Sequence, residues 1–483
     1  MGLRPVRRIA PDAASPAGSA GRALRRLLVD TAPLRVSPAF RRLWTGRAVS
    51  GFGAQMTLVA VMYQVWQATG STVWSGAVGL AQALPVVALG LPAGAVADRV
   101  DRRRLCLGSA FGQAACSALL AVQVLGTGFP VAAVLGLLAV QSSFGAFSGP
   151  ASGAFLPQLL PRESLAAGLA LNRIAFQAQM LLGPALGGIV IGVWGVGGCY
   201  LLDAVSFGAG LYGLFGLPAK PVAAAPAEEA ATAVTTAGSA TAVPTSAAVP
   251  TPLAVPTPAA SPTAVADPAA EEAPAVDGPA RPGLRGVADG LAFLARTPAV
   301  RGALLTDLAA TVLSMPISLF PLVDTERFGG DPRTLGLFLS AIAVGGIAAS
   351  VLSGSFTRLA RPGTVMLAGS ALWGVALACF GLSTRPWAAL GCLVVAGAAD
   401  TVAVVSRGTI VRLHTPDALL GRVGAAEQIV GQAGPDLGNM RGGLVASAWS
   451  GTAALVSGGL LCVAAVGAIA WGFRERSPRV ALP

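Results

Sequence analysis

The chain has 483 residues, of which 54% are hydrophobic and only 11% are charged. Soluble globular domains carry about 25% charged residues, so a chain this apolar would expose large oily surfaces in water. We therefore expect the lipid bilayer to be its solvent. The formal net charge is +11, but the basic residues sit in a few loops between apolar stretches. This distribution is typical of topology determinants and argues against a nucleic-acid partner.

The six cysteines all fall within apolar stretches and have no paired spacing, so we expect neither a disulfide framework nor a metal site. The sequence contains no P-loop, no paired-acid motif and no nucleophile with a base, which argues against an ATP-driven pump and a membrane enzyme. We expect no cofactor.

Taken in chain order, a polar tail is followed by two sets of apolar stretches, each long enough to cross a bilayer as a helix. The first set covers roughly residues 42–67, 73–97, 104–125, 129–151, 165–192 and 195–217. The second covers roughly residues 299–323, 334–356, 363–383, 387–411, 420–446 and 452–473. Between the sets lies a low-complexity segment rich in Pro, Ala and Thr, which predicts an extended linker.

The predicted organisation therefore has five parts. They are a disordered tail at 1–36, an N-terminal six-helix bundle at 37–217, a linker at 218–283, a C-terminal six-helix bundle at 284–475 and a short tail at 476–483. Arginines are concentrated in the tails, the linker and alternate loops, whereas the opposite loops hold only Arg327, Arg333 and Arg385. The positive-inside rule then places both termini and the linker in the cytoplasm, which is consistent with an even number of spans.

The two halves contain a repeated motif. The fifth span carries Gly183-Pro184-Ala-Leu-Gly, and the eleventh carries Gly434-Pro435-Asp-Leu-Gly about 250 residues later. Together with the matching order of spans, this repeat predicts an all-α integral membrane fold of twelve helices in two pseudo-symmetric bundles. Such duplicated halves place a binding cavity at their interface near the membrane midplane and operate by alternating access.

A glycine, acid and arginine motif follows the second span, with the pattern GxxxDRxxRR. Its residues are Gly94, Asp98, Arg99, Arg102 and Arg103. In this position the motif resembles the loop motif of the major facilitator superfamily. The resemblance implies that Asp98 and the arginines form a cytoplasmic gating network that stabilises the outward-facing state, because a carboxylate there gains charge-assisted hydrogen bonds and a helix N-terminus.

A second motif in the fifth span, made of Gly183, Pro184, Gly187 and Gly188, resembles the antiporter motif of exporters in that superfamily. Proline removes one helix hydrogen bond, so this pair can bend the span, although small residues also serve ordinary helix packing. The first and seventh spans resemble the branch that includes siderophore (enterobactin) and macrolide exporters.

The sequence departs from that family pattern at three places. Ala54 stands where relatives often carry an acid, the fourth span has Gln141 but no arginine, and the loop near Gly354 has lost its acid. The first two departures leave proton coupling open.

Charged residues inside predicted spans cost about 2.5–3.5 kcal/mol each at a helix centre, so each is a functional candidate. The candidates for the cavity or for coupling are Asp307, Asp400, Arg407, Gln428, Gln432, Asp436, Asn439 and Arg441. Gln428, Gln432, Asp436 and Asn439 fall within about 80° of one helical face, which predicts a polar stripe facing the cavity. The alternative for the charged residues is an ion-pair network that only fixes packing, such as Asp400 with Arg407.

Two further charged residues lie within the predicted spans of the N-terminal half. Arg47 in the first span either snorkels to the membrane surface or faces the cavity. Asp203 near the start of the sixth span is interpreted as structural.

These patterns indicate a secondary transporter of the bacterial plasma membrane, whose expected partners are a small-molecule substrate, protons and the lipid bilayer. We expect a monomer that exports an amphipathic drug, siderophore or natural product. An uncoupled facilitator or importer, and a non-transporting receptor on the same fold, remain alternatives.

Overall fold

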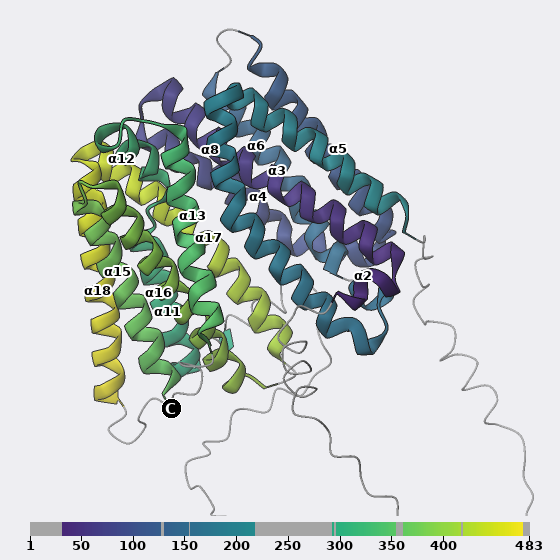
Figure 1. Ribbon diagram of the computed structural model, residues 1–483. Helices are drawn as coiled ribbons and strands as arrows, with labels where there is room; N and C mark the ends of the chain where they lie inside the picture. Colours follow the sequence, from purple (N-terminus) through teal and green to yellow (C-terminus); the bar gives the residue numbers. More distant parts are fainter. Residues whose placement is uncertain are drawn as a thin grey trace, which may run out of the picture. The chain divides into compact units, whose positions relative to one another are not determined.

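A computed structural model describes residues 31–126, 130–153, 155–217, 292–293, 296–353, 361–416 and 419–476. The predicted linker, the C-terminal tail after Arg476 and nearly all of the N-terminal tail lie outside these residues. Within the described part of the chain, the ordered elements are helices, which gather into a purple-to-teal group and a green-to-yellow group (Figure 1).

The described residues of the N-terminal half form seven helices. They are α2 (Ala32–Val36), α3 (Pro38–Thr69), α4 (Thr72–Arg99), α5 (Arg102–Gln123), α6 (Val131–Gly153), α7 (Leu156–Leu159) and α8 (Arg162–Phe215). Local capping fixes several of their ends: the Ser37 hydroxyl accepts from the Phe40 amide at 3.1 Å, and the Asp101 carboxylate accepts from the Arg103 amide at 2.8 Å. Gly70, with a φ of 57°, ends α3 in the left-handed conformation that glycine adopts most readily.

Helix α8 contains two membrane spans joined at a sharp turn. Its 54 residues would extend about 81 Å at 1.5 Å per residue, far more than a hydrocarbon core of roughly 30 Å. Gly195 is its one non-helical residue, with a φ of 71°. The Cys199 thiol reaches back to the Gly187 carbonyl at 3.5 Å, so the chain reverses at Gly195.

The C-terminal half repeats this arrangement with one interrupted helix. Its elements are α11 (Pro298–Ser314), the 3₁₀ turn η1 (Ile317–Leu319), α12 (Phe320–Arg327), α13 (Pro332–Val351), α15 (Pro362–Leu382), α16 (Pro386–Leu413), α17 (Leu420–Ala448) and α18 (Gly451–Arg476). The seventh span therefore consists of α11, η1 and α12, with a break at Met315 and Pro316. Proline at this point removes a backbone donor and interrupts the helix.

Among the described residues, ten helical runs are long and apolar enough to cross a membrane. Helix α8 is one such run but holds two spans, and α17, which is richer in polar residues, adds another. The predicted all-α fold of twelve transmembrane helices in two halves is therefore confirmed.

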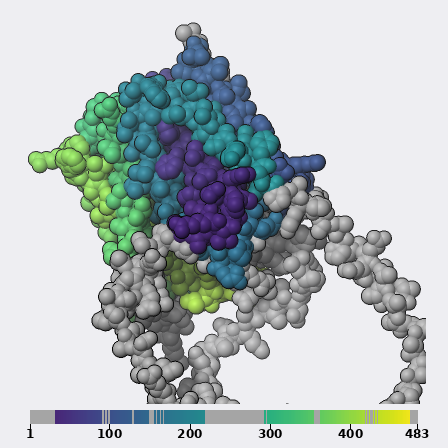
Figure 2. Space-filling model, turned by 45° about the vertical axis from the view of Figure 1, so that its right-hand side comes forward, coloured from purple at the N-terminus to yellow at the C-terminus, as the bar shows by residue number. Residues whose placement is uncertain are grey.

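The two halves meet near the ends of the helices that hold the Gly70 and Gly195 turns. There the Trp66 indole donates to the Thr325 hydroxyl at 2.8 Å, and the Thr72 hydroxyl donates to the Gly443 carbonyl at 2.7 Å. A side chain at Gly188 would collide with the Pro332 backbone, which shows how closely α8 approaches α13. Helix α3 reaches the molecular surface beside α8 (Figure 2).

Candidate functional site

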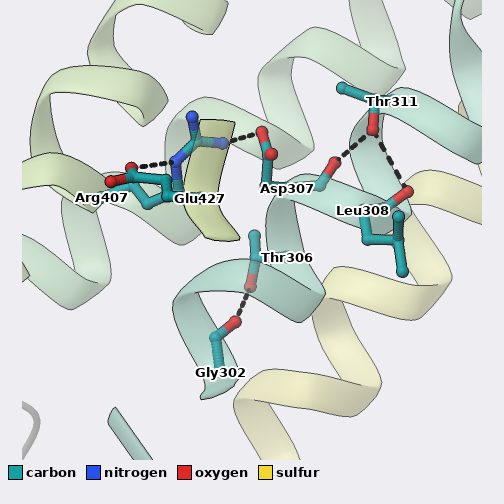
Figure 3. Close-up of polar contacts among 7 residues, drawn as sticks. All are labelled: Gly302, Thr306, Asp307, Leu308, Thr311, Arg407 and Glu427. Carbon is teal, nitrogen blue, oxygen red and sulfur yellow. Dashed lines mark hydrogen bonds and ion pairs between the residues drawn. The ribbon is translucent and has the colours of Figure 1, made fainter. Parts of the chain in front are cut away.

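A buried ion cluster joins three helices of the C-terminal half (Figure 3). Arg407 of α16 pairs with Asp307 of α11, and its Nε lies 3.3 Å from the Glu427 carboxylate of α17. The Arg407 and Asp307 side chains are each only 11% exposed, and Glu427 is 26% exposed. We call these three residues the Arg407 cluster. Two acids around one cation leave the cluster with a net charge of −1.

Asp400 lies two helical turns before Arg407 on the same face of α16. Its side chain is exposed but lies within electrostatic range of both Asp307 and Arg407. The suggested ion pair between Asp400 and Arg407 is not formed. Instead, the neighbouring helices α11 and α17 bring Asp307 and Glu427 into contact with the Arg407 guanidinium. Asp400 thus adds an acid next to the cluster that has no ion-pair partner among the described residues.

The polar residues near the middle of α17 hold the broken seventh span in place. The Asn439 side-chain oxygen accepts from the Ser318 amide at 3.0 Å, at the start of η1, and the Ser318 hydroxyl donates to the Asn439 carbonyl at 2.8 Å. The Arg441 guanidinium donates to the Leu313 carbonyl near the end of α11. These contacts satisfy backbone groups that the break leaves without helical partners.

This placement corrects the predicted polar stripe on α17. Asn439 is buried in a helix contact and does not face a cavity in this conformation. The Asp436 carboxylate lies against Gly79 of α4, in the opposite half. Gln428 and Gln432 belong to α17, but their side chains lie outside what the structure describes.

The repeated glycine motif makes equivalent contacts in the two halves. Gly183 and Gly187 of α8 pack on Gln55 and Met56 of α3. In the same way, Gly434 and Gly438 of α17 pack on Thr311 of α11. The fifth span thus packs on the first as the eleventh packs on the seventh.

The next position of the motif contacts the other half in both cases. Gly188 abuts Pro332 of α13, and Asn439 abuts Gly76 of α4. Pro184 also contributes, because its carbonyl lies against Gly336 of α13. The antiporter-like residues therefore pack either on the first span or across the interface between the halves.

The loop motif after the second span is described only in part. Gly94, Asp98 and Arg99 belong to the last turns of α4, and their side chains lie outside the described part. Arg102 and Arg103 begin α5, where the Arg103 guanidinium donates to the Phe215 carbonyl at 2.8 Å. This bond ties the motif to the end of the sixth span.

A second polar cluster lies within the N-terminal half. Asp203 of α8 is fully buried, and its carboxylate accepts from the Ser117 hydroxyl at 2.6 Å and from the Gln141 amide at 3.4 Å. Its other oxygen and the nearby Thr57 hydroxyl lack hydrogen-bond partners among the described residues. No described cation lies within ion-pair distance of this carboxylate. This buried cluster agrees with the structural interpretation of Asp203, and its partners Ser117 and Gln141 come from the third and fourth spans.

An open cavity of about 320 Å³ lies between α3 and α8. Its lining includes Trp44 and Arg47 of α3 and Asn172, Phe176 and Gln179 of α8. The two halves are in contact near the Gly70 and Gly195 turns. The cavity residues lie toward the opposite ends of these helices. Arg47 thus lines a cavity, one of the two positions expected for it. A neighbouring cavity of about 100 Å³ shares Trp44, Arg47 and Asn172.

Two bundles related by a repeat, which contact each other at one end and have an open cavity toward the other, define a transporter of the major facilitator superfamily. Within the described residues, no three His, Cys, Asp or Glu side chains are grouped to hold a metal ion. The sequence profile of the transmembrane secretion effector family matches residues 29–248 and 269–478. The chain belongs to this family.

Characterised relatives of the chain are exporters. The enterobactin exporter EntS of Shigella boydii is 25% identical over 427 residues, which cover 84% of this chain and 85% of the relative. The multidrug efflux pump Tap of Mycolicibacterium fortuitum is 27% identical over 410 residues, which cover 83% and 87% of the two chains. The chain is thus a membrane transporter and not an enzyme.

Solved structures share the fold at low sequence identity. A POT family transporter in complex with 5-aminolevulinic acid has a TM-score of 0.66 at 11% identity, covering 91% of this chain and 97% of that one. A bacterial homologue of the iron transporter ferroportin, in an inward-facing state, has a TM-score of 0.61 at 14% identity, covering 92% and 99%.

Proposed function

We propose that the chain exports a small amphipathic molecule across the bacterial plasma membrane by alternating access, in exchange for protons. The observation that carries this proposal is the asymmetry of the two ends. The halves are joined at one end by bonds such as Trp66 to Thr325, whereas the open cavity lined by Arg47 lies toward the other. Its aromatic and polar lining suits a molecule with both apolar and polar parts.

The orientation predicted from the arginine distribution would put the cavity end on the cytoplasmic side. In that orientation the conformation is inward-facing, ready to load substrate from the cell. Export then requires the contacts between α8 and α13 and between α4 and α17 to open while the cytoplasmic end closes. Asp98 and the motif arginines would stabilise that closed cytoplasmic end.

The Arg407 cluster and Asp400 are the proposed site of proton coupling. Embedded acids are costly in a membrane and commonly form proton relays. Here Asp307 and Glu427 pair with Arg407, and Asp400 lies within electrostatic range of the same guanidinium. Proton binding to one of these acids would remove the excess negative charge and weaken the cross-links among α11, α16 and α17, which allows these helices to move.

The proposal can be tested in everted membrane vesicles that carry the overproduced protein. Respiration acidifies the vesicle interior, and a coupled exporter should then accumulate an amphipathic efflux dye and release protons when the dye is added. Glu427→Gln should reduce dye-induced proton release at equal expression. Glu163→Gln, which removes an exposed acid at the start of α8, serves as the matched control.

An uncoupled facilitator is the second candidate. It is favoured by Ala54, which leaves the first span without an acid at a position facing the open cavity. Dye movement that persists unchanged after an ionophore collapses the proton gradient would favour the facilitator and exclude proton exchange.

A further inference from the structure

Two side chains on one face of α3 carry hydrogen-bond donors without partners in the described part of the chain. Arg47 is exposed in the open cavity, and no described carboxylate lies within ion-pair distance of it. Trp44 is one turn earlier on the same face, and its buried indole N–H has no acceptor among the described residues. Buried donors are nearly always hydrogen-bonded in native proteins, so an unused one beside a free cation points to a ligand that supplies acceptors.

The opposite wall of the cavity adds an amide and an aromatic surface. Asn172 and Phe176 lie one turn apart on α8, so they share a face, and Phe176 is 48% exposed. Asn172 lines both this cavity and the adjoining one, as Trp44 and Arg47 do. The donors therefore gather where the two cavities adjoin, next to an apolar ring surface.

Gln179 also lines the cavity and connects its two walls. Its side chain packs directly on Gly51 of α3 and donates to the Arg47 and Ala48 backbone carbonyls at 3.3 and 3.1 Å. Because these bonds hold α8 against α3, the walls that carry Trp44 and Phe176 are fixed relative to one another. No acid is present among the residues that line either cavity, so the site carries an unbalanced positive charge.

We propose that this site, which we call the Arg47 site, binds the oxyanion of an anionic, aromatic substrate. The guanidinium and the Trp44 N–H bind the oxyanion by charge-assisted hydrogen bonds, and the ring system rests on Phe176. This inference rests on the proposed export function and narrows its substrate class from amphipathic molecules in general to organic anions such as carboxylates, sulfonates or ionised phenols.

A matched pair of probes tests the charge requirement directly. The purified full-length protein, reconstituted in neutral phosphatidylcholine nanodiscs, is titrated calorimetrically with 2-naphthoate and with its uncharged amide, 2-naphthamide. The native protein should bind the naphthoate more tightly. Arg47→Gln should weaken naphthoate binding by about tenfold to a hundredfold, the range for one charge-assisted hydrogen bond, and leave naphthamide binding unchanged.

Two further variants keep the test sharp. Trp44→Phe preserves the ring but removes the donor, so it should also weaken naphthoate binding selectively. Arg41→Gln removes a charge from an exposed position of α3 that lines neither cavity and should leave both affinities unchanged. Equal binding of the two probes by the native protein would overturn the proposal, as would an Arg47→Gln variant that keeps its naphthoate affinity while eluting as a folded monodisperse species.

A phospholipid headgroup could supply the same anion chemistry. Nanodiscs that contain phosphatidylglycerol distinguish this source, because a lipid bound at Arg47 would compete with naphthoate. If lipid occupies the site, the native protein should lose naphthoate binding in the anionic nanodiscs, whereas Arg47→Gln should bind naphthoate equally in anionic and neutral nanodiscs. That pair of results would assign the site to lipid and overturn the substrate proposal. Export by everted vesicles alongside failed naphthoate binding would overturn the Arg47 site alone and leave the proposed function standing.

Discussion

Removing the cation of the Arg407 cluster offers the most direct test of the C-terminal half. In the Arg407→Gln variant, the Asp307 and Glu427 carboxylates face each other without a counter-charge. At 3.3 Å and an effective dielectric constant of about 20, the attraction between Arg407 and Glu427 amounts to about 5 kcal/mol. Desolvation offsets much of that attraction, and breaking a buried pair typically costs about 3–5 kcal/mol.

We expect a loss near the lower end of that range, about 3 kcal/mol, because Glu427 is 26% exposed and water screens it in part. The loss is measurable as a lower melting temperature of the purified protein in detergent. The double variant Arg407→Gln with Asp307→Asn should recover at least about 1 kcal/mol, since neighbouring partners couple by about 0.5–3 kcal/mol. Strictly additive losses would refute the structural reasoning, because they would mean that the two residues do not interact.

The same double variant separates packing from transport. If the cluster only fixes helix packing, recovered stability should bring back dye accumulation in everted vesicles. If the cluster carries protons, the double variant should be stable but should not release protons in exchange for dye. The two measurements together distinguish the alternatives that the sequence left open for these residues.

Three other changes test separate parts of the fold. Asp203→Ala should cost about 1–3 kcal/mol by leaving the Ser117 donor unpaired, whereas Asp203→Asn keeps an acceptor and should melt within a few degrees of the native protein; equal losses would contradict the cluster. Gly345→Leu should abolish the monodisperse peak in size-exclusion chromatography, because a side chain there collides with the α16 backbone, while Gly391→Leu, which has open space around it, should behave normally. Thr72→Val removes a hydrogen bond between the halves that is worth about 1 kcal/mol. Spin labels placed across the end of the molecule near Thr72 should therefore report a roughly fivefold larger open population. An unchanged distance distribution would argue against closure at that end.

Hydropathy and the arginine pattern were sufficient to predict the twelve spans, because each depends on local composition. They did not reveal that Gly195 alone separates the fifth and sixth spans within one helical run, or that the seventh span breaks at Pro316. Both features depend on single backbone conformations, which hardly change the average hydropathy of a window. Proline in the sequence Ser-Met-Pro-Ile-Ser was the one local signal of the break.

Site residues were harder to assign, because their partners come from other helices. Asp400 and Arg407 share a face of α16, so spacing alone suggested an ion pair between them. In the structure, the Arg407 guanidinium pairs with Asp307 and Glu427 instead. Asn439 was expected in a cavity because its helical face is polar, but its side chain packs on the broken span. Periodicity identifies which residues share a face, whereas tertiary packing decides what that face meets.

The Arg47 site and the Arg407 cluster together bear on the energy source. Under the Arg47 proposal the substrate leaves as an anion, and a membrane potential of about 100 mV, negative inside, favours the exit of one negative charge by about 2.3 kcal/mol. That energy alone sustains an outward gradient of about fiftyfold. Exchange for one proton moves a second charge in the same direction and doubles the electrical contribution, in addition to any pH gradient. A transporter of anions therefore tolerates Ala54, where a cation exporter would gain from an acid, because the potential already drives its substrate outward.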